Sequence, residues 1–156
     1  MRKSAALLVL FAVALFSHAD AQQKRVEAKD FSVQLFLERT GEFSRDIFKL
    51  EELAVHNFTY QAKDGEGGKF SGFLVRVELH SDGEIFAQGR QAQLIFRDRK
   101  TKKVLRTWNI ADVYIGDNGV GYRAQFFNDL NCELMEVTLT SGKTKITREL
   151  PFHCGE

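Results

Sequence analysis

The segment Phe73-Leu74-Val75-Arg76-Val77-Glu78-Leu79-His80 carries an apolar side chain at every second position. In an extended chain Phe73, Val75, Val77 and Leu79 lie on one face, and the side chains between them lie on the other. This period of two is typical of a β-strand with one buried face. The pattern returns, in places more weakly, over residues 31–37, 92–96, 103–115, 120–127, 132–140 and 144–152.

Turn sequences that contain glycine separate these segments: Asp64-Gly65, Asp82-Gly83, Asp117-Asn118-Gly119 and Ser141-Gly142. Glycine adopts positive φ at little cost, so such sequences favour tight turns between strands. We expect an all-β fold: a single antiparallel β-sandwich of immunoglobulin-like type, with about seven or eight strands over residues 31–156. A closed β-barrel is the alternative. Both cysteines follow Trp108, so the Cys…Trp…Cys order of a true immunoglobulin domain is absent.

Residues 43–61 combine two patterns. Phe43, Ile47, Leu50 and Ala54 recur at helical spacing behind Ser44, which could cap a helix, whereas residues 54–60 alternate like a strand. We expect a short helix or irregular turn near residues 44–52 and a strand over residues 53–61.

The first residues have the three parts of a secretion signal. Two basic residues precede an apolar run of 12 residues, 5–16, and residues 19–21 form a small-residue cleavage pattern. A membrane-spanning helix needs about 20 residues, so this run predicts a cleaved signal and no transmembrane anchor in the mature chain. We expect removal of residues 1–21, a flexible polar lead-in over residues 22–30, and a secreted or periplasmic protein.

The composition predicts one neutral domain. The chain of 156 residues has 22 basic and 21 acidic side chains, and removal of the signal takes two basic and one acidic, which leaves 20 of each. The mature chain therefore has no long-range attraction to nucleic acid, and none is expected as a partner. Fourteen phenylalanines supply ample apolar surface for a single core.

Cys132 and Cys154 are the two cysteines, and an even pair in an oxidising compartment predicts one disulfide. Both belong to a C-terminal hairpin around Ser141-Gly142, in which we expect Val137 opposite Ile146. That register places Cys132 opposite Pro151. A bulge or bend near Pro151 would then turn Cys154 toward Cys132.

A basic cluster occupies a predicted hairpin loop. Its cations, with only Asp98 among them, are Arg97, Arg99, Lys100, Lys102, Lys103 and Arg106. One interpretation is a solvated turn whose lysines keep the sheet edge from pairing with other chains. The other is a contact with an anionic partner such as a phosphate, an acidic glycan or a lipid headgroup, which salt would weaken.

Other motifs are sparse. Asn57-Phe58-Thr59 is a glycosylation acceptor sequence if the source is a eukaryote. The three mature histidines have no partner at metal-ligand spacing, and the nucleophile elbow, the Gly-rich phosphate loop and the zinc-protease helix are absent from the sequence, so we expect no cofactor or metal.

These observations favour a non-enzymatic binding or adhesion module whose partner is a protein, a glycan or another anionic surface. A small secreted hydrolase with an unrecognised site and a structural envelope component are the alternatives. A flat exposed aromatic or basic patch would favour the binding module. A pocket with two or more ionisable groups of perturbed pKa would favour the hydrolase.

Overall fold

The computed structural model describes residues 25–129 and 134–152, and this part of the chain is all-β apart from one 3₁₀ turn. The elements in chain order are β1 (Glu27–Leu37), η1 (Ile47–Lys49), β2 (Ala54–His56), β3 (Thr59–Gln61), β4 (Gly67–His80), β5 (Ile85–Asp98), β6 (Val104–Ile115), β7 (Val120–Phe127), β8 (Met135–Ser141) and β9 (Thr144–Leu150).

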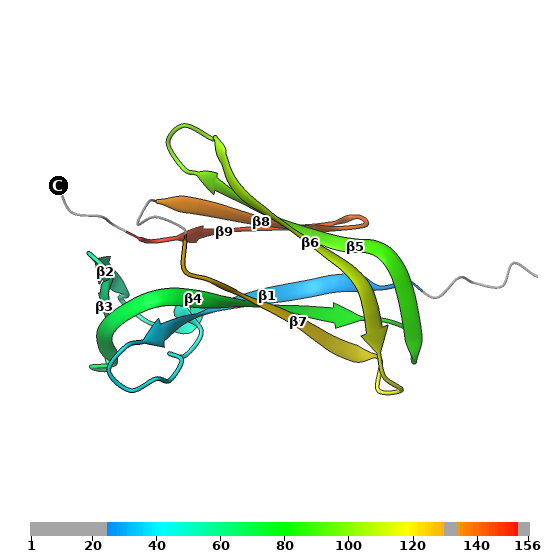
Figure 1. Ribbon diagram of the computed structural model, residues 1–156, viewed down its shortest axis with the longest axis horizontal. Helices are drawn as coiled ribbons and strands as arrows, with labels where there is room; N and C mark the ends of the chain where they lie inside the picture. The colour runs from blue at the N-terminus through cyan, green and yellow to red at the C-terminus, as the bar shows by residue number, and fades with distance from the viewer. Residues whose placement is uncertain (1–24, 130–133, 153–156) are drawn as a thin grey trace, which may run out of the picture.

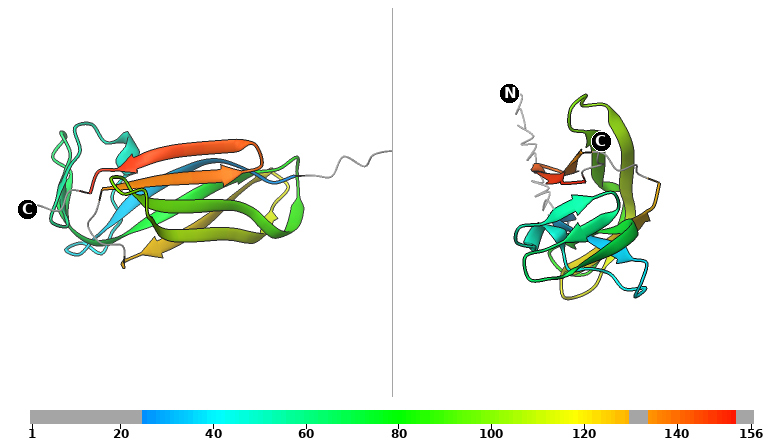
Figure 2. Two further views of the ribbon diagram at one scale, coloured as in Figure 1. Left: turned by 90° about the horizontal axis from the view of Figure 1, so that it is seen from above. Right: turned by 90° about the vertical axis from the view of Figure 1, so that its left-hand side faces the viewer.

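The strands form two antiparallel sheets. One has the order β1-β4-β3-β2, with β7 also paired to β4, and the other has the order β6-β5-β8-β9. Figure 1 shows them as two layers, and Figures 1 and 2 place the short β2–β3 hairpin at one end of the molecule. The alternative of a closed barrel is wrong, because β6 and β9 end one ladder and are not paired to the other sheet.

The predicted alternation produces the core between the layers. Phe73, Val75, Val77 and Leu79 of β4 are all buried, as the period of two requires. Burying one such side chain contributes about 1.5 to 3 kcal/mol. Fully buried partners from both sheets pack in the same cluster: Val33, Leu35, Leu94, Phe96, Val137 and Leu139.

Strand β1 begins at Glu27, inside the expected lead-in of residues 22–30. Val26 and Ala28 are buried, and the Ala28 N–H donates to Ser141 Oγ at 3.0 Å. The ladder to β4 shifts register between Ala28 and Asp30. This irregularity moves the buried positions from even to odd numbers, so the alternation that starts at Phe31 conceals the first part of the strand.

Residues 43–61 match the prediction in part: η1 is the short helix or turn expected near residues 44–52, but its cap and the strand that follows differ. Asp46, not Ser44, caps the short η1 turn, because its side chain accepts from the Phe48 N–H. The expected single strand is a hairpin, in which Asn57 and Phe58 have φ of 45° and 60° between the paired residues of β2 and β3. Positive φ at both central residues is the geometry of a type I′ turn.

The C-terminal hairpin forms with a register two residues from the expected one. Leu139, rather than Val137, lies opposite Ile146, and the two-residue turn is Gly142-Lys143. Gly142 has φ of 55°, which suits the first position of this turn. The ladder ends at Met135 and Leu150. Cys132 and Cys154 lie outside the described residues.

The free edge of β1 is covered by the segment that follows it. The Leu35 N–H donates to Ser44 Oγ at 2.9 Å, and the Val33 N–H donates to Asp46 Oδ1 at 3.1 Å. Covering an edge in this way prevents pairing with another chain. Among the described residues, no helix is long and apolar enough to span a membrane.

Candidate binding surface

Three phenylalanine rings form a cluster on the outer face of the β1-β4-β7 sheet. Phe36 of β1 and Phe126 of β7 point outward because their neighbours Leu35 and Phe127 point into the core. Phe43 joins them through an isolated β-bridge to Phe36. The ring centroids are 5.4 Å (Phe36–Phe43), 5.9 Å (Phe36–Phe126) and 6.3 Å (Phe43–Phe126) apart.

This aromatic cluster, Phe36, Phe43 and Phe126, is exposed although its rings contact one another. Phe43 and Phe126 are 43% and 41% exposed, and Phe36 is half-buried. Leu74, also half-buried, lies on the same face and is paired with Phe126. Exposed apolar side chains that gather in one group make this face the candidate binding surface.

The Phe126 ring of the cluster lies directly over Gly72 of β4. A Cβ at this position would lie 2.5 Å from Phe126 Cζ and 2.7 Å from the Phe127 carbonyl oxygen. Real Cβ atoms do not approach other atoms so closely, so any larger residue would displace the Phe126 ring or the backbone of β7. The absence of a side chain in β4 therefore allows Phe126 to lie over the sheet.

Charged and polar side chains lie on this outer face around the cluster. Arg76 of β4 lies 5.3 Å from the centroid of Tyr122 of β7, a cation–π contact. At the opposite side of the cluster, Lys69 Nζ is 3.2 Å from Glu38 Oε2. The cluster thus has a polar border with charges of both signs, which is typical of protein interfaces.

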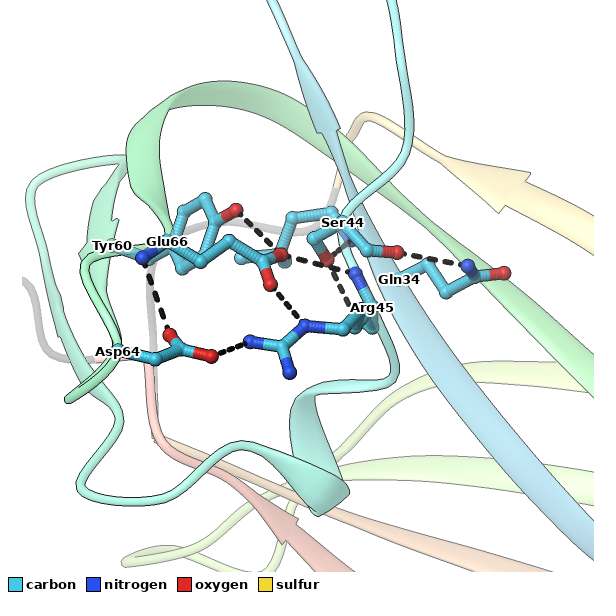
Figure 3. A network of polar contacts seen from close by, with 7 residues as sticks. Gln34, Ser44, Arg45, Tyr60, Asp64 and Glu66 are labelled. Carbon is cyan, nitrogen blue, oxygen red and sulfur yellow. Dashed lines mark hydrogen bonds and ion pairs between the residues drawn. The ribbon is translucent and has the colours of Figure 1, made fainter.

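A polar network holds the segment that carries Phe43 (Figure 3). The guanidinium of Arg45 pairs with the carboxylates of Asp64 and Glu66, and the Arg45 N–H donates to Glu66 Oε1 at 3.1 Å. The buried Tyr60 hydroxyl donates to the same oxygen at 3.0 Å. Gln34 Nε2 donates to the Ser44 carbonyl at 2.8 Å. These contacts fix Ser44 and Arg45, the residues directly after Phe43.

The pKa shifts in this network keep its groups in their ordinary charge states at neutral pH. The Glu66 N–H, and then Arg45, hold the pKa of Asp64 below its usual value. Partial burial raises the pKa of Glu66, but hydrogen bonds from Arg45 and Tyr60 outweigh it and lower the pKa. Burial, and then the bond to Glu66, raise the pKa of Tyr60 to about 12. None of these groups is poised to exchange a proton near pH 7.

Neither of two pockets that are lined by described residues brings two ionisable side chains together. One is apolar and lies at the end of the molecule near the β2–β3 hairpin; it is lined by Phe58, Phe70, Ser71, Gly72, Phe73, Phe127, Asn128 and Phe152. The other is polar and contains Arg90 as its one ionisable group. Within the described ranges, no group of His, Cys, Asp and Glu side chains is arranged to hold a metal ion.

The basic cluster lies in the β5–β6 hairpin, as expected, but acidic residues from other strands surround it. Three of its cations form ion pairs: Arg99–Glu149 at 3.1 Å, Lys102–Glu136 at 3.2 Å and Arg106–Asp129. Arg97, Lys100 and Lys103 have no ion pair within the described part of the chain. The local excess of positive charge is therefore smaller than the sequence indicates.

Asn57 is exposed in the β2–β3 turn, where its Nδ2 lies 3.1 Å from His56 Nε2. The aromatic cluster was missed in the sequence because Phe36 falls on the polar face of its strand. That position is the one available signal, since a phenylalanine at an outward position among Ser32, Gln34 and Glu38 departs from the pattern.

The fold and this surface define an antiparallel two-sheet β protein with an aromatic cluster on the outer face of one sheet. Comparison with models of known protein families and with curated proteins gives no match. Function is therefore inferred from the geometry of the described residues.

Proposed function

We propose that this chain is a non-enzymatic, extracytoplasmic binding module that contacts a protein partner through the aromatic cluster. The observation that carries the proposal is the exposure of Phe36, Phe43 and Phe126 as one contiguous group, supported by Gly72. Aromatic residues surrounded by a polar border are enriched at protein interfaces and supply most of the binding free energy there.

The ring geometry favours a protein over a glycan. The Phe126 ring lies at 83° to Phe36 and 76° to Phe43, so the three rings form an irregular apolar surface. A sugar ring stacks on a flat aromatic face and needs hydrogen-bonding groups beside it. The cluster consists of phenylalanines, which have no polar group, and the nearby amide of Gln34 donates to Ser44. Apolar side chains of a protein surface match such a cluster better.

The strand order supports an immunoglobulin-like type for the fold. Strands β1, β4 and β7 correspond to A, B and E of that type, and β5, β8 and β9 correspond to C, F and G. Strand β6 pairs with β5 in the manner of C′. The β2–β3 hairpin is an addition between β1 and β4.

We also propose the export and the disulfide predicted above. The N-terminus of exported protein should be Gln22, which sequencing of the first residues checks; an intact Met1 on protein outside the cytosol would contradict cleavage. For the disulfide, the paired residues Met135 and Leu150 are close in sequence to Cys132 and Cys154, which favours a link between them.

The proposed function can be tested with a double variant, Phe43→Ser/Phe126→Ser. We expect the immobilised wild-type protein to retain a partner from the exported fraction of its source, and the purified partner to bind the variant at least about tenfold more weakly. The matched control is Phe86→Ser, since Phe86 is 59% exposed but lies on β5. Equal binding to wild type and the double variant would contradict the proposal.

A further inference from the structure

Phe58 has a backbone conformation that a bulky residue rarely adopts. It occupies the second central position of the β2–β3 turn with φ of 60°, where glycine is favoured. Asn57 before it tolerates positive φ, because asparagine commonly adopts this region. The side chain of phenylalanine cannot form the local hydrogen bonds that stabilise asparagine in this region. Positive φ at Phe58 is therefore a conformational strain in the backbone.

The ring of Phe58 forms one wall of the apolar pocket. It is 42% exposed and contacts the edge of Phe70, with centroids 5.8 Å apart. The ring centroids of Phe70 and Phe152 are 5.7 Å apart, and those of Phe152 and Phe73 are 5.4 Å apart. A strained residue that places an exposed aromatic ring at a pocket is a reason to infer function there.

The pocket is chemically selective. Five phenylalanines line it, no charged side chain does, and Ser71 and Asn128 supply its polar groups. The free space in it is small, about 20 Å³, which admits the end of a side chain rather than a whole residue. The shape and chemistry fit the end of one uncharged apolar side chain.

The pocket adjoins the aromatic cluster at Gly72, although the cluster lies on the outer face of the sheet and the pocket is walled mainly by inward-pointing rings. Gly72 lines the pocket and also lies beneath the Phe126 ring. Phe127, the next residue of β7, points inward and contacts Phe73 at 5.5 Å in the pocket wall. A partner that covers the cluster is therefore next to the pocket, and interfaces often insert one anchor side chain into such a site.

We propose that the pocket bounded by Phe58, Phe70, Phe127 and Phe152 receives an aliphatic side chain of the protein partner, such as leucine. This inference rests on the proposed function, since the same partner would cover the aromatic cluster. The strained turn at Phe58 is retained because it completes the wall of this anchor site.

N-acetyl-leucinamide serves as the probe. Its binding is detected by nuclear magnetic resonance from shifts of the backbone amide signals of Ser71 and Asn128. We expect saturable shifts with this probe and none with N-acetyl-glycinamide, which has no side chain, or N-acetyl-lysinamide, which is charged. Absence of saturable shifts with the leucine amide, or equal shifts with the glycine amide, would overturn the proposal.

Two variants separate the function of the Phe58 ring from its backbone strain. Phe58→Gly and Phe58→Ala both remove the ring and should both abolish saturable binding of the probe. Phe58→Gly should melt a few degrees above Phe58→Ala, because glycine adopts positive φ without strain, and no lower than wild type. A melting temperature of Phe58→Gly well below wild type would show that the ring serves folding, and would overturn the assignment.

The Phe43→Ser/Phe126→Ser variant distinguishes the two proposals. It should bind the leucine amide as wild type does and fail to bind the partner. If the wild-type protein binds its partner through the cluster but does not bind the leucine amide, the proposed anchor pocket alone is overturned. Amide binding together with unchanged partner affinity of the double variant overturns the proposed function alone.

Discussion

The Tyr60 hydroxyl connects two parts of the chain through one carboxylate. Tyr60 lies in β3, is 1% exposed, and donates to Glu66, which in turn accepts from the Arg45 backbone two residues after Phe43. A buried hydroxyl bonded to a charged acceptor contributes more to stability than a neutral pair. The position of one exposed ring of the aromatic cluster thus depends on a buried phenol.

The first prediction is that Tyr60→Phe lowers the free energy of unfolding by about 1 to 2 kcal/mol, since it removes this donor and leaves the ring in place. The difference from wild type should depend on pH. The pKa of Tyr60 is about 12 when folded and 10.0 in a model phenol, so its stabilising effect is complete below pH 10 and is lost as the pH rises toward 12. Urea unfolding of both proteins at several pH values measures this. A difference that stays constant up to pH 12 would contradict the shift.

The second prediction concerns Gly72. Gly72→Ala should destabilise the protein by about 1 to 3 kcal/mol and displace Phe126, because the new Cβ would contact both the ring and the Phe127 carbonyl. Gly116→Ala is the control, since the nearest heavy atom to its Cβ is 3.8 Å away. Urea unfolding checks the stability, and the aromatic signals of Phe126 check its position. Equal stability of the two variants would contradict the conclusion that the Phe126 ring requires a glycine at position 72.

At the residue scale, alternation predicts which side chains of β4 are buried but not which outward residues gather. Phe36 and Phe43 come together through the turn after β1, and Phe126 joins them from a strand about 90 residues later. Such proximity depends on sheet order and register, which a sequence pattern does not specify. The basic cluster was found because its residues are adjacent in sequence, whereas its acidic partners come from β8, β9 and the segment after β7.

Elements were predictable where the period of two is uninterrupted. The expected strands at residues 31–37, 73–79, 92–96 and 120–127 lie inside observed strands. The errors fall at local irregularities: the register shift near Lys29, the turn at Asn57-Phe58 and the two-residue change in the last hairpin. Positive φ at Asn57, Phe58 and Gly142 sets the register of the two hairpins, and an inserted residue shifts it in β1; neither is specified by the alternation of side chains.

The third prediction treats the β5–β6 hairpin as an anion contact. Lys100 and Lys103 have no ion pair among the described residues, whereas Lys102 pairs with Glu136. If the hairpin binds anions, Lys100→Gln/Lys103→Gln should reduce the salt concentration that elutes the protein from heparin, because two positive charges without an ion pair are lost. Lys102→Gln should have a smaller effect. Identical elution of wild type and the double variant would favour the solvated-turn interpretation.

The fourth prediction is that a disulfide joins Cys132 and Cys154 and closes a loop of 23 residues counting both cysteines. Cross-linking such a loop stabilises a protein by about 3 kcal/mol, chiefly by restricting the unfolded chain. The Cys132→Ser/Cys154→Ser variant should melt at a lower temperature and keep its β signal in circular dichroism, because buried residues of β1, β4, β5 and β8 pack together in one core cluster. Two titratable thiols in native exported protein would contradict the link.

At the scale of the whole molecule, the two sheets are joined along one side by Arg148. This residue of β9 extends to β1 of the opposite sheet, where its guanidinium donates to the Phe31 carbonyl and lies 2.8 Å from Asp30 Oδ1. The same guanidinium lies 5.0 Å from the ring centroids of both Phe31 and Phe48. The Arg148 side chain thus contacts a backbone carbonyl, a carboxylate and two aromatic rings at the edge where the two sheets meet.

The fifth prediction follows from the sum of these contacts. The ion pair with Asp30 is half-exposed and contributes little, whereas the carbonyl contact and the two aromatic contacts together contribute about 1 to 2 kcal/mol. Arg148→Met keeps the apolar stem and should lower the free energy of unfolding by that amount in urea. Arg148→Lys should lose much of it too, because an ammonium group lacks the planar surface that stacks on both rings. Lys145→Met, on the exposed side of β9, is the control and should change the free energy by less than about 0.5 kcal/mol. If Arg148→Met is as stable as this control, the contacts of Arg148 contribute nothing measurable to the joining of the two sheets.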